Sequence, residues 1–425
     1  MDALRKASAY LRGSRDPSSQ MELPKCVERA YVLGKDSGHR GPVIGGYLTT
    51  GFEDIQLAST VTPSGLTVVR ADSGSVLSQL KPDDGDAFTS SCLVRLRLES
   101  EPQDRLCGLA IGTQAGSIIL VELASSVRVI ASCKTNVSAI TCLGIIEPSI
   151  ILAGTLGGNL LLYDPIHHPE TPSVSVGVSS DFNAVTAVCP VSLDGRMQVW
   201  VAIDKEGIIL FDLQSDSAGV NSMSRCALEP IQHERMRSIT SMAPSSAHRL
   251  MLCLSACDEV LLIDMVTHEL VQRYPAALMT CGSALSSIAA VELPTAPGST
   301  FLFLGGIDGS LSMRELSRRQ KDMKLQCILH RCIDSLTPHD RNITVERPDP
   351  SGGCPITSVS VSDTQDACVV GDASCALYVI PLQLRTLSRA SSHTGSDLDE
   401  ENCAQTVTDQ RSLAEDSCKI VSDNV

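Results

Sequence analysis

The sequence has few aromatic side chains. Phe, Trp and Tyr make up 3% of its 425 residues, and Trp200 is the single tryptophan. A hydrophobic core must therefore be built mainly from Val, Ile, Leu, Ala and Cys, a composition that favours short β-strands. Hydrophobic residues reach 43% and charged residues 20%, which is close to the average for globular domains and excludes a wholly disordered protein.

The chain also lacks long apolar runs. No segment approaches the roughly 18 consecutive apolar residues that a membrane-spanning helix needs, and the N-terminus has no apolar signal-peptide core. We therefore expect a cytoplasmic protein whose 17 cysteines are reduced thiols, because the cytosol opposes structural disulfides. The formal net charge of -15 opposes binding to phosphate backbones, so we expect no nucleic acid partner.

Short motifs typical of enzymes are absent. The sequence has no G-x-x-x-x-G-K-[ST] phosphate loop, no G-x-S-x-G nucleophile turn and no H-E-x-x-H metal helix. Cys253 with Cys257, and Cys327 with His330 and Cys332, offer potential zinc ligands, but their spacing differs from the paired ligands of structural zinc sites. We interpret them as thiols in sheets beside an exposed histidine. The sequence thus predicts a protein that is not an enzyme, with no catalytic residues, no metal site and no cofactor.

One short hairpin pattern recurs along most of the chain. It joins an apolar strand, a tight polar or Gly-containing turn and a second apolar strand, and its seven copies start at Leu57, Leu109, Ile151, Val199, Leu252, Phe303 and Cys368. The turn positions are Gly65, Gly116, Gly158, Gly207, Glu259, Gly309 and Cys375. The spacings between them are 51, 42, 49, 52, 50 and 66 residues. Glycine suits this place because a two-residue hairpin turn needs positive φ.

Further apolar runs of strand length flank the hairpins. The runs that precede them are Val43–Thr49, Leu93–Leu98, Val137–Leu143, Ala184–Val191, Ile239–Ala243, Ile288–Leu293 and Ile356–Val361. A third strand follows several hairpins, as in VRVIASC from Val127 and HELVQRY from His268. Four strands in about 40 to 50 residues predict an all-β fold, a single seven-bladed β-propeller of four-stranded antiparallel blades.

The expected propeller covers residues 25–384. Its last copy lacks one strand, and we expect the N-terminal segment Glu28–Gly34 to supply it and close the ring. Residues 1–24 are expected to form a tail or a short helix. Residues 385–425 are expected to form an acidic, Ser-rich disordered tail, because their few apolar clusters cannot offset the entropy lost on ordering.

Three copies end their second hairpin strand with an apolar or aromatic residue followed by aspartate. These pairs are Tyr163-Asp164, Phe211-Asp212 and Ile263-Asp264, and they resemble the Trp-Asp dipeptide of WD repeats in position and period. No Trp-Asp pair is present, and the upstream Gly-His pair of typical repeats is absent. Two of these copies, those that end at Asp164 and Asp212, also resemble the divergent propellers of large assemblies, such as ciliary trafficking coats and nutrient-signalling scaffolds. The resemblance implies a subunit of a cytoskeletal, ciliary or vesicle-coat assembly.

The leading functional interpretation is a non-enzymatic scaffold that binds other proteins. One alternative is a propeller that binds a small ligand, or hydrolyses one, in its central channel. Such a site needs His, Asp or Glu at a channel mouth, whereas the expected inner strands are almost wholly apolar or small. Another alternative is a membrane-coat or trafficking adaptor with peripheral membrane contact.

A basic run interrupts the acidic chain between the sixth and seventh copies. Arg318, Arg319, Lys321 and Lys324 lie in this stretch, and we predict that they contact an acidic partner or an anionic membrane, because loops on rigid scaffolds commonly carry binding sites. A solvated loop explains the same residues. In the tail, Ser388 and Ser391 follow arginines in the pattern of basophilic kinase sites, although chance in a Ser-rich segment explains this pattern too.

Overall fold

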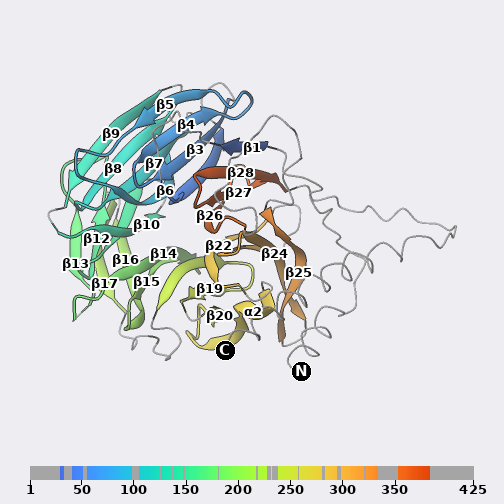
Figure 1. Ribbon diagram of the computed structural model, residues 1–425. Helices are drawn as coiled ribbons and strands as arrows, with labels where there is room; N and C mark the ends of the chain where they lie inside the picture. The colour runs from blue at the N-terminus through green and yellow to red at the C-terminus, as the bar shows by residue number, and fades with distance from the viewer. Residues whose placement is uncertain are drawn as a thin grey trace, which may run out of the picture.

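The computed structural model of the chain describes residues 29–32, 41–50, 55–97, 105–124, 126–135, 137–146, 149–179, 181–216, 219–226, 231, 238–256, 258–279, 283–293, 298–319, 322–333 and 353–382. Within this part of the chain, seven four-stranded antiparallel sheets stand around one ring (Figure 1). The tails expected at residues 1–24 and 385–425 lie outside it. Among the described residues, no helix has the length and apolar character needed to cross a bilayer.

Each sheet is one blade, and its strands are named A to D from the ring axis outwards. Blade 1 contains β2 (Gly45–Thr50), β3 (Gln56–Thr62), β4 (Gly65–Arg70) and β5 (Val76–Leu80). Blade 2 contains β6 (Phe88–Arg97), β7 (Arg105–Thr113), β8 (Ser117–Leu123) and β9 (Val127–Lys134). Blade 3 contains β10 (Ile140–Ile146), β11 (Ile150–Thr155), β12 (Asn159–Tyr163) and β13 (Val174–Gly177).

The remaining blades follow the same order. Blade 4 contains β14 (Val185–Leu193), β15 (Arg196–Ile203), β16 (Gly207–Asp216) and β17 (Gly219–Arg225). Blade 5 contains β18 (Ile239–Ser245), β19 (Leu250–Ser255), β20 (Glu259–Asp264) and β21 (Leu270–Pro275). Blade 6 contains β22 (Leu285–Val291), β23 (Thr300–Gly306), β24 (Ser310–Arg319) and β25 (Asp322–Cys332). Blade 7 contains β26 (Ile356–Val361), β27 (Ala367–Asp372), β28 (Ala376–Pro381) and β1 (Arg29–Val32).

The ring closes through the N-terminal strand. β1 pairs antiparallel with β28, with Arg29 opposite Val379 and Val32 opposite Ala376. In Figure 1 the dark blue β1 lies beside the red-orange β28. The strand predicted within Glu28–Gly34 is therefore confirmed as strand D of blade 7, and the first and last parts of the propeller share one sheet.

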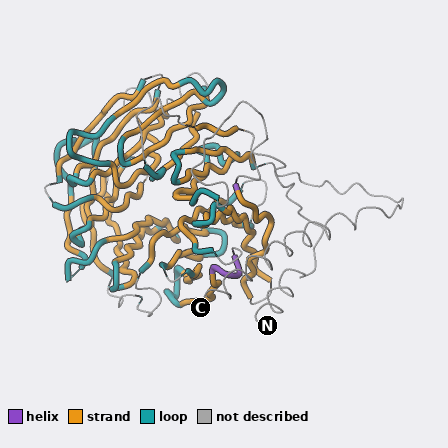
Figure 2. The backbone as a smooth tube through the Cα atoms, viewed as in Figure 1, coloured by secondary structure: helices purple, strands orange, loops and turns teal. Residues whose placement is uncertain are grey.

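Two faces of the ring follow from the strand order. Because neighbouring strands run in opposite directions, the B–C and D–A connections lie together on one face, called the upper face, and the A–B and C–D connections lie on the lower face. Figure 2 shows these loops in teal at the two ends of the orange strands. The single described helix, α2 (Ala276–Met279), belongs to the D–A connection between blades 5 and 6; no sequence pattern predicted it.

Predicted inner strands and hairpins are confirmed. The run predicted at Ile356–Val361 coincides with β26, and the Gly-rich run at Val43–Thr49 becomes β2. Two B–C turns lack a glycine, and non-glycine residues adopt positive φ there, namely Asp258 at 58° and Cys375 at 70°. The fifth turn thus bends at Asp258, one residue before the position predicted from the repeat.

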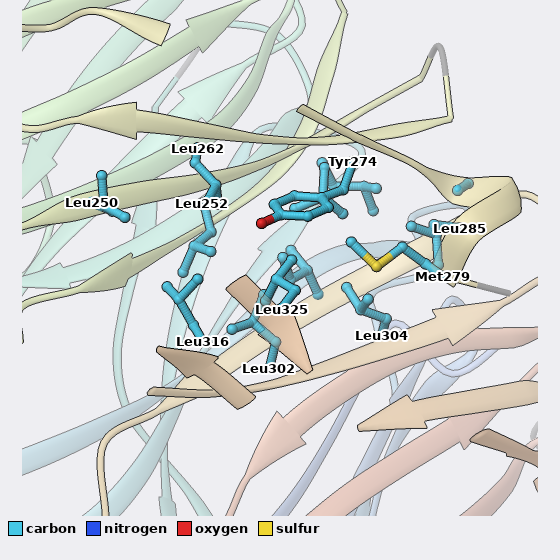
Figure 3. Packing of buried hydrophobic residues seen from close by; sticks show 14 of the residues in the cluster. Leu250, Leu252, Leu262, Tyr274, Met279, Leu285, Leu302, Leu304, Leu316 and Leu325 are labelled. Carbon is cyan, nitrogen blue, oxygen red and sulfur yellow. The ribbon is translucent and has the colours of Figure 1, made fainter. Parts of the chain in front are cut away.

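The core lies between blades rather than in one central mass. Figure 3 shows one such layer, in which Leu250 and Leu252 of blade 5 face Leu302 and Leu304 of blade 6. These four side chains are at most 3% exposed, and full burial of one Leu stabilises the fold by about 1.5–3 kcal/mol. Small and aliphatic residues can fill such thin layers, which explains how a chain with few aromatics builds this fold.

Candidate protein-interaction surfaces

A hydroxyl group recurs at the start of the inner strands. In six of the seven blades the pairing of strands A and B shifts register immediately after the first residue of strand A. The residues at these bulges are Thr89, Thr141, Thr186, Thr240, Ser286 and Thr357. In the sequence each one follows a large apolar residue, so the position recurs once in each of these periods.

Four of these six hydroxyl groups join neighbouring blades. The Thr357 hydroxyl donates to the carbonyl oxygen of Val43, just before β2 of blade 1, at 2.8 Å and to that of Gly371 in its own blade at 3.3 Å. Thr141 in the same way donates to the carbonyl oxygen of Val185 in blade 4, and equivalent bonds link blade 2 to blade 3 and blade 6 to blade 7. The other two bulge hydroxyls donate within their own blades, so all six are used inside the ring.

Charged side chains are rare on the inner strands. Among the described residues, β2, β6, β10, β14, β18, β22 and β26 contain no Asp, Glu or His, and their charged residues are Arg95 and Arg97. The Arg95 guanidinium donates to the carbonyl oxygen of Asp363 at 2.6 Å, which connects blade 2 to the A–B turn of blade 7. These strands supply no carboxylate pair for acid and base catalysis, so they give no support to a hydrolytic channel.

Two aspartates of the motif resembling WD repeats have a local structural role. Oδ1 of Asp164 accepts hydrogen bonds from two backbone N–H groups, and its Oδ2 lies 2.7 Å from Nδ1 of His167. Oδ1 of Asp264 likewise accepts from the N–H groups two and three residues later, at 2.8 and 2.9 Å. Both side chains fix C–D turns on the lower face, whereas Asp212 lies inside β16.

The predicted basic residues lie in a hairpin. Arg318 and Arg319 end β24 and pair with the first residues of β25, on which Lys324 is exposed. Lys321 lies outside the described residues. The expectation of an inserted loop at this position is therefore wrong, because strands C and D of blade 6 continue through it; the extra length of the seventh period falls after β25.

Buried contacts explain why this hairpin remains paired. Leu316 and Met323 are at most 5% exposed and belong to the apolar layer between blades 5 and 6. The Tyr274 hydroxyl donates to the carbonyl oxygen of Met323 at 2.9 Å, and Nε2 of His248 lies 3.0 Å from the carbonyl oxygen of Leu316. Two bonds from blade 5 thus anchor the base of the hairpin, and its basic end lies at the lower face.

Other residues selected from the sequence remain apart or lie outside the described chain. Cys327, His330 and Cys332 lie along β25, and burial together with the nearby Arg314 guanidinium lowers the pKa of His330. In the described part of the chain, no group of three His, Cys, Asp or Glu side chains is placed to share a metal ion. Cys257 and the predicted phosphorylation sites Ser388 and Ser391 are outside the described residues.

An exposed apolar patch on the upper face was not predicted. Val137, Leu156 and Phe182 are 42%, 56% and 80% exposed. They belong to three connections around blade 3: the D–A connection before it, its own B–C turn, and the D–A connection after it. We call these three residues the blade 3 patch. An exposed phenylalanine in an aromatic-poor chain is a signal, but its exposure depends on the folded loops.

Comparison with known proteins identifies the fold. No family model and no curated protein matches the sequence. The structure is similar to a chain in the crystal structure of the Mitotic Checkpoint Complex, at 13% identity over 87% of this chain and 98% of that chain, with a TM-score of 0.54. It is similar to the WD40 beta propeller domain of Doa1, at 13% identity over 84% of this chain and 97% of that chain, with a TM-score of 0.54.

A third similar structure is that of BBS1N in complex with ARL6DN, soaked with mercury. Its identity is 11% over 84% of this chain and 96% of that chain, with a TM-score of 0.54. At such identities the likeness concerns the fold alone. The chain therefore has the fold of WD40 β-propellers, as the Tyr-Asp, Phe-Asp and Ile-Asp pairs predicted.

Proposed function

We propose that this WD40-type propeller is a non-enzymatic scaffold that holds proteins of one complex in a fixed relation. One observation carries the proposal. The polar groups of the inner strands are used in hydrogen bonds within the ring, whereas the surface connections carry exposed side chains. The bulge hydroxyls and Arg95 are bonded within the ring. A rigid ring that presents different loops on two faces is suited to hold several partners.

The similar structures support protein partners. One is a chain of the Mitotic Checkpoint Complex, and another is BBS1N in complex with ARL6DN. We place the scaffold in the cytoplasm because Cys142, Cys189 and Cys253 are free thiols in the strands, as expected in a reducing compartment. Burial raises the pKa of Cys142 and of Cys189 to about 12, so these thiols are protonated and serve as small apolar residues.

The basic end of the blade 6 hairpin is one proposed contact surface. Arg318 and Arg319 end β24 and Lys324 is exposed on β25, next to the C–D connection, in a protein whose net charge is -15; Lys321, outside the described residues, adds a positive charge to the same stretch of sequence. A partner with an acidic segment complements this charge, and the attraction acts mainly on the rate of association and on specificity. Single surface charges contribute little to stability, so we expect their reversal to change binding more than stability.

Affinity purification of the full-length tagged protein from its own cells tests the scaffold role. We expect co-purifying proteins in fixed stoichiometry, both with the full chain and with a version that ends at Leu384. A lone monomer in both preparations would refute the scaffold role.

A matched charge reversal tests the hairpin. Arg318, Arg319 and Lys324 are changed to Glu together, and the control changes Lys81, Lys134 and Arg225, which are exposed on other blades, by the same total charge. We expect recovery of a partner to fall by about 10-fold only for the hairpin variant. Equal recovery from both variants would remove the hairpin from the proposal and leave the scaffold role intact.

A further inference from the structure

Phe182 stands on the upper face in an unusual conformation. Its side chain is 80% exposed, more than any other large hydrophobic side chain in the described part of the chain. Its φ of 58° lies in the left-handed region, which bulky residues rarely adopt. An exposed ring and a strained backbone both oppose folding, so the stability of the propeller does not account for this residue.

Neighbouring side chains hold the Phe182 loop in place. The Ser179 hydroxyl oxygen accepts a hydrogen bond from the N–H group of Asn183 at 2.8 Å, which closes the loop around Phe182. Glu206, from the B–C turn of blade 4, accepts a hydrogen bond from the Ser179 hydroxyl and another from the Asn183 amide at 3.0 Å. Residues of two blades therefore hold the backbone around Phe182 in its left-handed conformation.

The connections that carry Val137 and Leu156 lie next to this loop. The N–H group of Leu156 donates to the D–A connection that carries Val137, at 2.8 Å. On the other side of the same turn, Gly158 has a φ of +75°, and a Cβ there would lie 2.8 Å from the carbonyl oxygen of Asn183. Glycine thus permits the B–C turn and the Phe182 loop to pack closely, and the three connections that carry these exposed apolar residues lie side by side on the upper face.

Acidic side chains predominate around this surface. The described B–C and D–A connections contain two basic residues, Lys81 and Lys205. Their acidic residues are Asp83, Asp84, Asp86, Asp181, Asp204, Glu206, Asp258 and Asp308. Asp181 adjoins Phe182, and Asp204 with Glu206 lies in the turn that holds its loop. The described connections next to Phe182 therefore attract cationic groups and repel acidic segments and anionic lipids.

We propose that the blade 3 patch binds a short basic segment of another protein that carries an apolar side chain. The apolar side chain covers Phe182 and Leu156, and Lys or Arg residues beside it face Asp181 and Asp204. The proposal rests on the scaffold function and adds the chemistry of one partner. An anchor of this kind, desolvated at the centre and ringed by charges, is typical of a protein interface.

Selection from random peptides tests the proposal without any assumption about which protein is the partner. The purified full-length protein selects from a displayed library of peptides of about 12 residues, a length that spans the patch at roughly 3.3 Å per residue. Peptides that also bind the Phe182→Ser protein are removed. We expect the remaining sequences to combine Lys or Arg with an apolar residue.

Affinity measurements on the selected peptides locate the site. We expect Phe182→Ser and Leu156→Ser each to weaken binding by about 10-fold or more, and added salt to weaken it further. The matched control is Ile307→Ser, a 52% exposed residue in the B–C turn of blade 6 on the same face, and it should keep the affinity within about 2-fold. Unchanged urea midpoints of the three variants show that each still folds.

Three outcomes overturn the patch: no peptide that depends on Phe182, selected peptides that are acidic, or recruitment to anionic lipid vesicles that depends on Phe182. These outcomes are separate from those of affinity purification. In one outcome, stoichiometric partners co-purify with the Phe182→Ser protein as well as with the natural one, while no Phe182-dependent peptide is found. That result supports the scaffold function and refutes peptide binding at the blade 3 patch. If peptides bind through Phe182 but the purified protein is always alone, the patch stands and the scaffold role fails.

Discussion

Replacing Gly154 by alanine is expected to strain the seam between blades 3 and 4. Gly154 lies buried in β11, and a Cβ at this position would be 2.4 Å from Cγ1 of Val185 in blade 4 and 2.6 Å from Sγ of Cys142. The backbone of Gly154 is ordinary extended strand without a positive φ, so alanine adds no backbone strain at this position. The substitution therefore tests the distance between two blades.

The magnitude follows from the size of this overlap. Carbon atoms pack at about 3.5–4.0 Å, so the contact with Val185 is more than about 1 Å too short. Val185 is 0% exposed and stiff at χ1 as a β-branched residue, so the blades must move instead. Overpacking of this kind costs about 1–3 kcal/mol. We expect a loss of about 2 kcal/mol, which lowers the ratio of folded to unfolded protein by about 30-fold.

Urea unfolding followed by the fluorescence of Trp200 measures this loss. Trp200 is the only tryptophan and is fully buried in blade 4, in the apolar layer that this blade shares with blade 5, so its fluorescence reports unfolding of the ring. The matched control is Gly177→Ala in the same blade as Gly154, where the nearest atom to an added Cβ is Oδ1 of Asn159 at 3.8 Å. The control should stay within about 0.5 kcal/mol of the natural protein. Equal midpoints for both variants would show that the blades are not in this close contact.

A second substitution tests the contact directly. Val185→Ala alone removes two buried methyl groups and should cost about 1.5 kcal/mol or more. In the double variant the new methyl group at Gly154 occupies part of the space that Val185 vacates, so the combined loss should be at least about 1 kcal/mol smaller than the sum of the single losses. Additive losses would show that the added methyl group and the Val185 side chain do not compete for the same space.

Three further predictions concern single groups. Burial lowers the pKa of His268 below its ordinary 6.5, so the unfolded chain binds this proton more readily and stability falls as the pH drops through that value. We expect His268→Phe to lessen the decline in the urea midpoint between about pH 7.5 and 5.5, read from Trp200, whose ring centroid lies 5.7 Å from that of His268. Equal declines in the variant and the natural protein would contradict this. Asp372→Ala should lower the free energy of unfolding by about 3 kcal/mol, because this buried carboxylate accepts hydrogen bonds from two backbone N–H groups and two hydroxyls. Tyr378→Phe removes one of these bonds and should cost about 1 kcal/mol. Similar losses for the two variants in urea titrations would contradict this prediction. Since burial raises the pKa of Cys189 to about 12, iodoacetamide at about pH 8 should leave this thiol unmodified in the folded protein and alkylate it in urea, and equal labelling by mass spectrometry would show that the thiol is accessible.

Much of the fold was predictable because each hairpin is encoded by nearby residues. The B–C turns follow from glycines such as Gly116 and Gly309, which adopt φ of 84° and 78°, and the strands on both sides follow from their apolar character. The closing strand was predictable because the seventh copy was one strand short. The basic hairpin was misplaced because an apolar layer beneath Leu316 and Met323, rather than local charge, keeps those strands paired.

The candidate sites were harder to predict. The basic residues of the blade 6 hairpin were visible as a charge reversal in an acidic chain, but the sequence did not indicate that they lie on strands. Phe182 was visible as one of few aromatic residues, yet nothing in its neighbourhood of the sequence indicates exposure. That property depends on Glu206, 23 residues beyond Asn183 in the chain, whose carboxylate holds the loop.

The strand pattern, the number of blades and the source of the closing strand can be predicted from the amino-acid order alone, since turn chemistry and strand patterning act over a few residues. How the blades are joined, and which side chains stay exposed, depends on the packing of the folded ring. The bond from Thr357 to the carbonyl oxygen of Val43 spans 314 positions, and the close approach of Gly154 to Val185 joins two sheets. Such contacts exist only after the ring has closed, because residues distant in the chain become neighbours through the packing of whole blades.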